Sequence, residues 1–207
     1  LIHENNCIIR AIILGEGITS RSEERNTEKW VNELSKHQKN IETARKYIGY
    51  GATKSFNFPD NRFDTVPLLN IIKTIENAKQ EFQPDIIFTH HGGDLNIDHQ
   101  KTFKAVITAT RPLQEEMVKS IITFETPSAT EWQASSDPNN FTPNLFIKIS
   151  KENLDAKIKG MEAYEFEKRK YPHPRSPKAL KILAQRYGVM MGGEYFEAFQ
   201  IIRIKSV

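Results

Sequence analysis

The sequence contains a single cysteine, Cys7, among 207 residues. A disulfide framework and a cysteine-rich metal cluster are therefore both excluded. So little cysteine is typical of a reducing compartment, and we expect a cytoplasmic protein. Cys7 stands in the stretch "NNCIIRAIIL", where we expect it at a buried strand edge.

Long apolar runs and blocks of like charge are also missing. No stretch reaches the roughly 18 residues that a membrane span needs, and the N-terminus lacks the charged-then-apolar pattern of a signal peptide. The 29 basic and 26 acidic side chains nearly balance, with a formal net charge of +3. We therefore expect neither a membrane span nor a nucleic-acid partner, and a small-molecule partner stays open.

What is present is the composition of an ordinary globular domain, 38% hydrophobic and 27% charged. A chain of this length can bury one sizeable core, and no repeat or long linker divides it. We expect a single domain over residues 1–207, and self-association into a homo-oligomer stays open.

Apolar periodicity predicts alternating strands and helices. Short β-rich runs at 8–14 and 85–90 are each followed by a polar loop and a helical pattern, as in an α/β protein with a parallel sheet. Helices are expected at 24–48, ending at Gly49, and at 66–82, 98–110, 151–170 and 177–188. Further strands are expected at 120–126, 144–150 and 198–204, and the polar loop 127–143 is expected to form a lid or rim.

One polar segment, "FTHHGGDLNIDHQ" (88–100), follows the second apolar run directly. Ligands gather beyond the carboxyl ends of parallel strands, so the position suits a metal site. It equally suits a polar loop in which Asp94, Asn96 or Asp98 caps the next helix. Catalytic zinc takes about three protein ligands, and the spacing here supplies no obvious set.

The sequence of this segment resembles a motif of a known enzyme family. "THHGGDLNIDHQ" resembles the H-x-x-D-L-N-x-D-H segment of the LmbE-like, or PIG-L-like, zinc-dependent de-N-acetylases. "FPDNRFDTVPLLNIIKTIE" (58–76) resembles the D-N-R-x-D loop and helix of a bacterial branch of that family. "HPRSPKALKILAQRYGVMMGGEYFEAF" (173–199) resembles its ending. The three matches follow in order and cover most of the chain.

The resemblance implies a Rossmann-like, mostly parallel sheet flanked by helices and holding one zinc ion. It also implies a hydrolase that removes the N-acetyl group from an amino sugar of the N-acetylglucosamine kind, or from its conjugate. By match to the motif, His99 is the zinc ligand and Asp98 helps to hold the ligand geometry. Asn96 is expected to contact the substrate or the oxyanion.

The sequence departs from the family at its front. The family's first strand ends in H-P-D-D-E, which supplies two zinc ligands and the general base, and this chain has no such motif. Its start, "LIHENNCIIRAIIL", resembles the end of the following helix and the second strand, so we expect the first strand upstream of Leu1. That absence leaves an open sheet edge and weak zinc binding by His99 alone, and His3 is no substitute. The alternative is a non-catalytic, sugar-binding relative that kept the fold.

Arg21 lies in "GEGITSRSEER" (15–25), a loop that should reach the same sheet edge and contact a sugar hydroxyl or a phosphate. The G-x-G of this loop lacks the third glycine of a dinucleotide fingerprint, which disfavours a nucleotide-binding domain. The resemblance also places a polar cluster on the substrate side, although a simple turn with surface ion pairs explains it too: Asp60, Asn61, Arg62 and Asp64.

His173 and Arg175 stand between prolines in "YPHPRSP". Proline restricts the backbone, so these side chains lose little entropy on binding, and we expect them to contact substrate. A solvent-exposed loop histidine is the equally open alternative for His173.

Overall fold

The computed structural model describes residues 7–205 and shows a mixed α/β protein. Its described residues form five α-helices and two sheets, which confirms the predicted fold class. The chain divides into two compact units, each described by itself below. The first comprises the chain up to Asp60 and from Lys148 to Phe196, and the second runs from Asn61 to Ile147 and from Glu197 onward. The single domain expected from the length stays a prediction.

In the first unit, a β-α-β crossover joins two parallel strands. Strand β1 (Arg10–Gly15) pairs with β2 (Ala52–Phe58), and helix α2 (Val31–Ile48) connects them. Helix α2 ends as predicted at Gly49, whose φ of 90° is readily adopted by glycine. Among the described residues β1 pairs on one side only, with β2.

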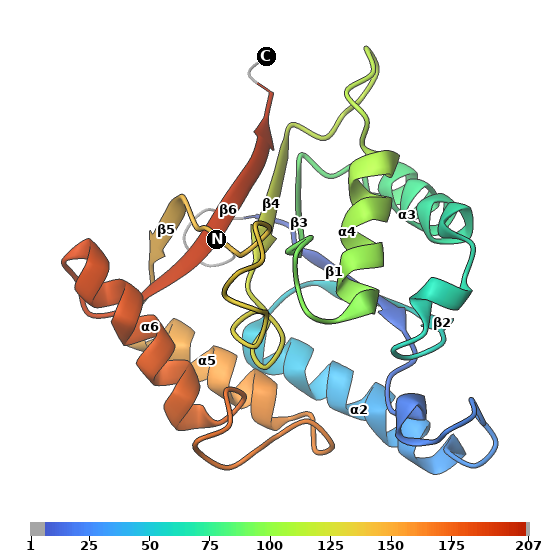
Figure 1. The fold of residues 1–207 in the computed structure, drawn as a ribbon, viewed down its shortest axis with the longest axis horizontal. Helices are drawn as coiled ribbons and strands as arrows, with labels where there is room; N and C mark the ends of the chain where they lie inside the picture. The colour runs from blue at the N-terminus through green and yellow to red at the C-terminus, as the bar shows by residue number, and fades with distance from the viewer. Residues whose placement is uncertain (1–6, 206–207) are drawn as a thin grey trace. The chain divides into compact units, whose positions relative to one another are not determined.

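Two further helices complete this unit, α5 (Lys151–Glu162) and α6 (Pro177–Met191), and α5 contacts both α2 and α6 (Figure 1). Each begins at a serine, Ser150 or Ser176, whose hydroxyl accepts a backbone N–H of the first turn. Leu154, Ala184 and Tyr195 form a small buried cluster. The helices are thus fixed by local caps and by their apolar faces.

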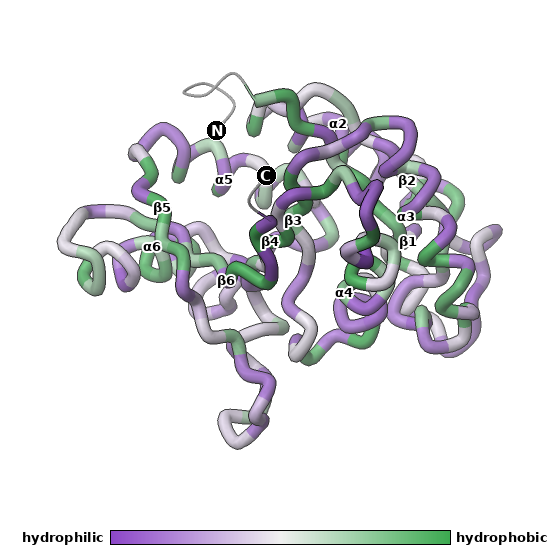
Figure 2. Tube along the Cα trace, turned by 90° about the horizontal axis from the view of Figure 1, so that it is seen from above, coloured by the Kyte–Doolittle hydropathy of each residue, from purple (hydrophilic) through white to green (hydrophobic). Residues whose placement is uncertain are grey.

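The second unit holds most of a four-stranded sheet with the order β3-β4-β6-β5. Strands β3 (Ile86–His90) and β4 (Ser120–Phe124) are parallel, and β6 (Phe196–Ile204) runs antiparallel to β4, with β5 (Leu145–Lys148) beside it. The apolar residues of β6 form the green stretch at its label in Figure 2.

Helices α3 (Leu68–Phe82) and α4 (Ile97–Ala109) lie side by side in this unit (Figure 1). Their buried residues include Ile71, Ile75 and Val106, and Ile121 of β4 is fully buried. Helix α4 connects β3 to β4, so the polar segment at its start lies at the carboxyl end of a parallel pair. No helix in residues 7–205 has the length and apolar character that crossing a bilayer requires.

Some local predictions were wrong. Helix α2 begins at Val31 rather than Glu24, because a turn precedes it in which the Trp30 indole donates to the Ser22 hydroxyl. Helix α5 ends at Glu162 rather than near residue 170. The chain turns directly after Glu162, and the Tyr164 ring packs against His37. Cys7 is exposed, not buried, since β1 begins only at Arg10.

Strand β2 was not predicted from the sequence. Its residues, "ATKSFNF", form no apolar run, and four of the seven are exposed. The expected helix end at residues 1–6, and His3 with it, lie outside the described residues.

Candidate active site

Asn96 caps helix α4. Its side-chain oxygen accepts the backbone N–H groups of Asp98 at 2.8 Å and His99 at 3.3 Å. This satisfies two of the donors that a helix start leaves free. Of the three candidates in the sequence, the cap is therefore Asn96, and Asp98 is a first-turn acid favoured by the helix dipole.

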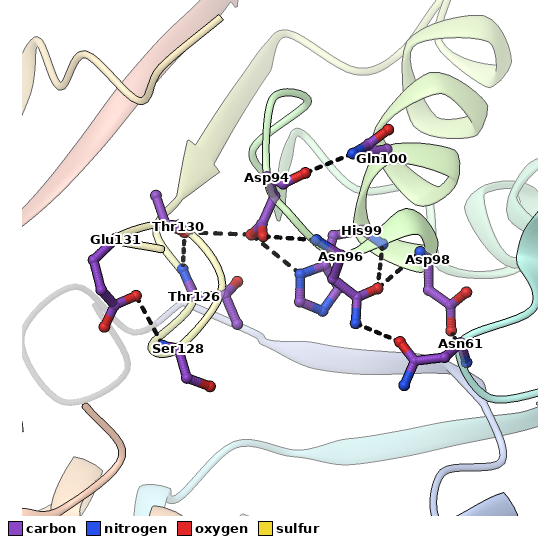
Figure 3. A network of polar contacts seen from close by, with 10 residues as sticks. All are labelled: Asn61, Asp94, Asn96, Asp98, His99, Gln100, Thr126, Ser128, Thr130 and Glu131. Carbon is purple, nitrogen blue, oxygen red and sulfur yellow. Dashed lines mark hydrogen bonds and ion pairs between the residues drawn. The ribbon is translucent and has the colours of Figure 1, made fainter. Parts of the chain in front are cut away.

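Asp98 binds the loop that precedes α3. One carboxylate oxygen accepts the backbone N–H of Asn61 at 2.7 Å (Figure 3), and the other accepts the backbone N–H of Phe63 at 2.9 Å. Asn96 adds a third link, since its side-chain nitrogen donates to the Asn61 side-chain oxygen at 2.7 Å. Asn61 has a φ of 53°, a conformation that asparagine tolerates better than most residues. The first turn of α4 thus holds the D-N-R loop in place.

The His99 ring is held by Asp94, four residues before Asp98. Nδ1 of His99 lies 3.1 Å from Oδ2 of Asp94, whose side chain is fully buried (Figure 3). A carboxylate can only accept, so Nδ1 carries the proton in this contact. In the neutral ring the lone pair then lies on Nε2, as a metal-binding histidine requires.

Burial and neighbouring groups shift the pKa values of Asp94 and His90. Burial raises the pKa of the Asp94 carboxyl, but the hydrogen bond from His99, its charge and the Asn96 N–H together outweigh burial and leave the pKa below its ordinary value. His90 stacks on His99 with ring centroids 4.1 Å apart. Burial, with His99 beside it, lowers the pKa of His90 to about 3, so His90 is a neutral neighbour at physiological pH.

His99 suits the role of one metal ligand, but residues 7–205 contain no group of three histidine, cysteine, aspartate or glutamate side chains that could hold a metal ion. The described residues therefore fit part of a zinc site and not a closed set.

The remaining substrate candidates of the second unit lie at a short 3-10 helix, Phe63–Thr65: Arg62 just before it and Asp64 within it. Arg62 precedes it and its carbonyl accepts the backbone N–H of Thr65 at 3.0 Å, while Asp64 is exposed. This places Arg62 and Asp64 next to Asn61 on the loop that Asp98 holds.

The other four candidates lie in the first unit. Oδ2 of Asp60 accepts from the backbone N–H and hydroxyl of Ser20. Arg21 and Arg175 both pair with one carboxylate, Glu167, and Arg21 also donates to the Phe166 carbonyl at 2.8 Å. Nδ1 of His173 accepts the backbone N–H of Arg175 at 3.1 Å. The segment between the prolines therefore forms a turn that the bond from Arg175 to His173 closes.

Sequence reasoning missed two functional candidates and one structural residue. Asp94 was considered only as a helix cap, and Thr130 lies in the polar loop 127–143, where nothing singled it out. Glu167 lies within the helix predicted at 151–170, and nothing in the sequence indicates its two arginine partners. All three are recognised only by their contacts.

Comparison with known proteins identifies a family and shared folds. The family described as PIG-L, GlcNAc-PI de-N-acetylase, matches residues 2–110. No curated protein sequence matches. Among solved structures, N,N'-diacetylchitobiose deacetylase from Pyrococcus horikoshii is similar with a TM-score of 0.70 at 16% identity, covering 95% of this chain and 73% of its own.

Two further structures share the fold. A40926 pseudoaglycone deacetylase has a TM-score of 0.70 at 17% identity, covering 97% of this chain and 87% of its own. The 4-carboxy-2-hydroxymuconate hydratase from Pseudomonas putida KT2440 has a TM-score of 0.68 at 15% identity, covering 97% and 86%. The family match spans more than half of the 207 residues, and the chain belongs to the PIG-L family.

Proposed function

We propose that this protein is a zinc-dependent hydrolase that removes the acetyl group from an N-acetylated amino sugar or its conjugate. The observation that carries the proposal is the His99–Asp94 pair, which presents Nε2 of a histidine at the carboxyl end of β3. Membership of a family described as a de-N-acetylase supports the same chemistry.

Zinc, when bound, would polarise the acetyl carbonyl and lower the pKa of an attacking water. His99 is proposed as one ligand, and a complete site needs further ligands beyond those that residues 7–205 group together. Asp94 would keep the His99 ring oriented.

Asn96 and Asp98 would act mainly by holding the backbone of the site. The Asn96 amide oxygen is used for the helix cap and one of its two N–H groups for Asn61, so an oxyanion contact would use the second N–H. Asp98 holds Asn61 and Phe63, and we propose that the loop thereby presents Arg62 and Asp64 to the sugar. For Arg21, Asp60, His173 and Arg175, contact with the sugar stays a prediction.

The full product of the gene tests this proposal by zinc content and by acetate release from N-acetylglucosamine-containing sugars. His99→Ala should lower both, because the proposed ligand is removed. Lys104→Ala, an exposed change on the same helix, is the matched control and should alter neither. Unchanged zinc content and acetate release in His99→Ala would show that His99 is not the ligand.

The competing function is a sugar-binding protein without catalysis, favoured by the incomplete metal set in the described residues. The shared fold does not decide between reactions, since a hydratase has it as well as the deacetylases. Sugar binding without zinc or acetate release would support this second function and exclude the first.

A further inference from the structure

The turn that follows β4 reaches the site because of the parallel pairing of β3 with β4. His90, the last residue of β3, pairs with Phe124, the last residue of β4. The two segments beyond these residues therefore leave the same sheet edge side by side, as Figure 3 shows. Within the second segment, Thr126 to Glu131 form a compact turn.

This turn is closed by its own side chains. The Thr126 backbone N–H donates to the Thr130 hydroxyl oxygen at 2.6 Å, and the Ser128 N–H donates to the Glu131 carboxylate at 2.8 Å. The Thr130 hydroxyl has then one proton to donate, and it faces Oδ2 of Asp94 at 3.3 Å. The turn thus holds a hydrogen-bond donor, the Thr130 hydroxyl, beside the Asp94 carboxylate.

Asp94 is the meeting point of three donors. Its Oδ1 accepts the backbone N–H of Asn96 at 3.3 Å, and its Oδ2 faces both Thr130 Oγ1 and His99 Nδ1. The side chain is fully buried, and a buried carboxylate that loses a partner is costly. Asn96 and Thr130 therefore fix where Oδ2 lies, and Oδ2 fixes the His99 ring.

We propose that Asp94 and Thr130 are positioning residues, which hold His99 with the proton on Nδ1 and the lone pair on Nε2. The loop 127–143 is then part of the site through Thr130, and not only its rim. This inference rests on the proposed function, whose ligand histidine it concerns.

The protonated nitrogen of His99 is read directly from long-range proton–nitrogen correlation spectra of the ¹⁵N-labelled full chain, at a pH where the imidazole is neutral. Wild type should show the proton on Nδ1. In Asp94→Asn, the amide oxygen is required by the Asn96 N–H, so the NH₂ group takes the place of Oδ2 and donates to Nδ1. In the metal-free chain, where Nε2 binds no zinc, the proton of His99 should therefore move to Nε2.

Thr130 offers a matched pair of variants. Thr130→Val removes the hydroxyl and keeps the shape, and the second tautomer should then become measurable. Thr130→Ser keeps the hydroxyl and should give the wild-type spectrum. Glu131→Gln, which changes the same turn without touching Asp94, should also leave the spectrum unchanged. Zinc affinity should fall about 10–100-fold in Asp94→Asn.

A proton on Nε2 in wild type, or an unchanged tautomer in a folded Asp94→Asn, would overturn the proposal. A wild-type spectrum in Thr130→Val would remove Thr130 from it. If Asp94→Asn does not fold, Thr130→Val decides, because it keeps the buried carboxylate. The tautomer does not depend on turnover: an inactive enzyme with the expected spectra would overturn only the proposed function.

Discussion

The carboxylate of Asp98 accepts the backbone N–H of Asn61 at 2.7 Å, so the first turn of α4 holds a loop that lies 37 residues earlier in the chain. A second bond, to Phe63 N–H, makes the contact bidentate. Two segments that carry the family-like motifs are thereby joined by hydrogen bonds from backbone N–H groups to a side-chain carboxylate, and the backbone of the D-N-R loop is fixed whatever its side chains bind.

Asp98→Ala should therefore loosen this loop. Hydrogen bonds to a charged group contribute about 1.5–3 kcal/mol, so we expect the free energy of unfolding to fall by about 2 kcal/mol. Urea unfolding measures this loss, and faster amide hydrogen exchange at Asn61 and Phe63 locates it. Asp64→Ala, an exposed change in the same loop, is the stability control. Unchanged exchange at Phe63 would contradict the role given to Asp98.

Gly93 should tolerate no side chain. A Cβ at this position would lie 2.0 Å from the carbonyl oxygen of Asn139, and that carbonyl also faces Nε2 of His91 at 2.6 Å. Gly93→Ala should displace loop 127–143 and make it sensitive to limited proteolysis, with a loss of about 1–3 kcal/mol. Ser135→Ala, exposed in the same loop, should leave proteolysis unchanged. Resistance of Gly93→Ala to protease would show that the loop does not pack there.

Glu16 should make the first unit sensitive to acid. Its buried carboxylate loses solvation, which raises the pKa, but Arg25 and Thr19 donate to it and leave the pKa below 4.5. Because the folded pKa is the lower one, the stabilisation is complete above the unfolded value and is lost as the pH falls through the folded value. Glu16→Gln should lower the free energy of unfolding at neutral pH by about 1–2 kcal/mol.

Below pH 4.5 the stability curves of wild type and Glu16→Gln should converge, as denaturant titrations across pH can measure. Glu23→Gln, an exposed acid of the same loop, is the matched control. A constant difference between wild type and Glu16→Gln down to strongly acid pH would rule out this linkage.

A variant of Arg21 distinguishes a role in stability from a role in substrate binding. Its guanidinium and the Glu167 carboxylate are 36% and 30% exposed, so their pair should contribute under about 1 kcal/mol to stability. Arg21→Ala should therefore keep its unfolding midpoint, whereas a role in binding predicts a higher KM for the sugar. An unchanged KM would remove Arg21 from the substrate site. Lys36→Ala, which breaks a more exposed pair with Glu165 in the same unit, is the control for KM.

Elements with strong local signals were predicted well. Helices α3 and α4 begin and end within two residues of expectation, because apolar spacing, Asn96 and the residue before Pro84 mark them locally. Strand β2 gave no such signal: its exposed, polar residues are held in a strand by hydrogen bonds to β1, and pairing is not visible in a single segment.

The sequence by itself determined the α/β order, the end of helix α2 at Gly49 and the place of the histidine segment after β3, since these depend on residues close in the chain. Only the tertiary structure decided which acid orients His99. Adjacent residues on a helix point about 100° apart, so Asp98 turns to Asn61 while His99 turns to Asp94. The hydroxyl that holds Asp94 comes from Thr130, which strand pairing alone brings to that edge of the sheet.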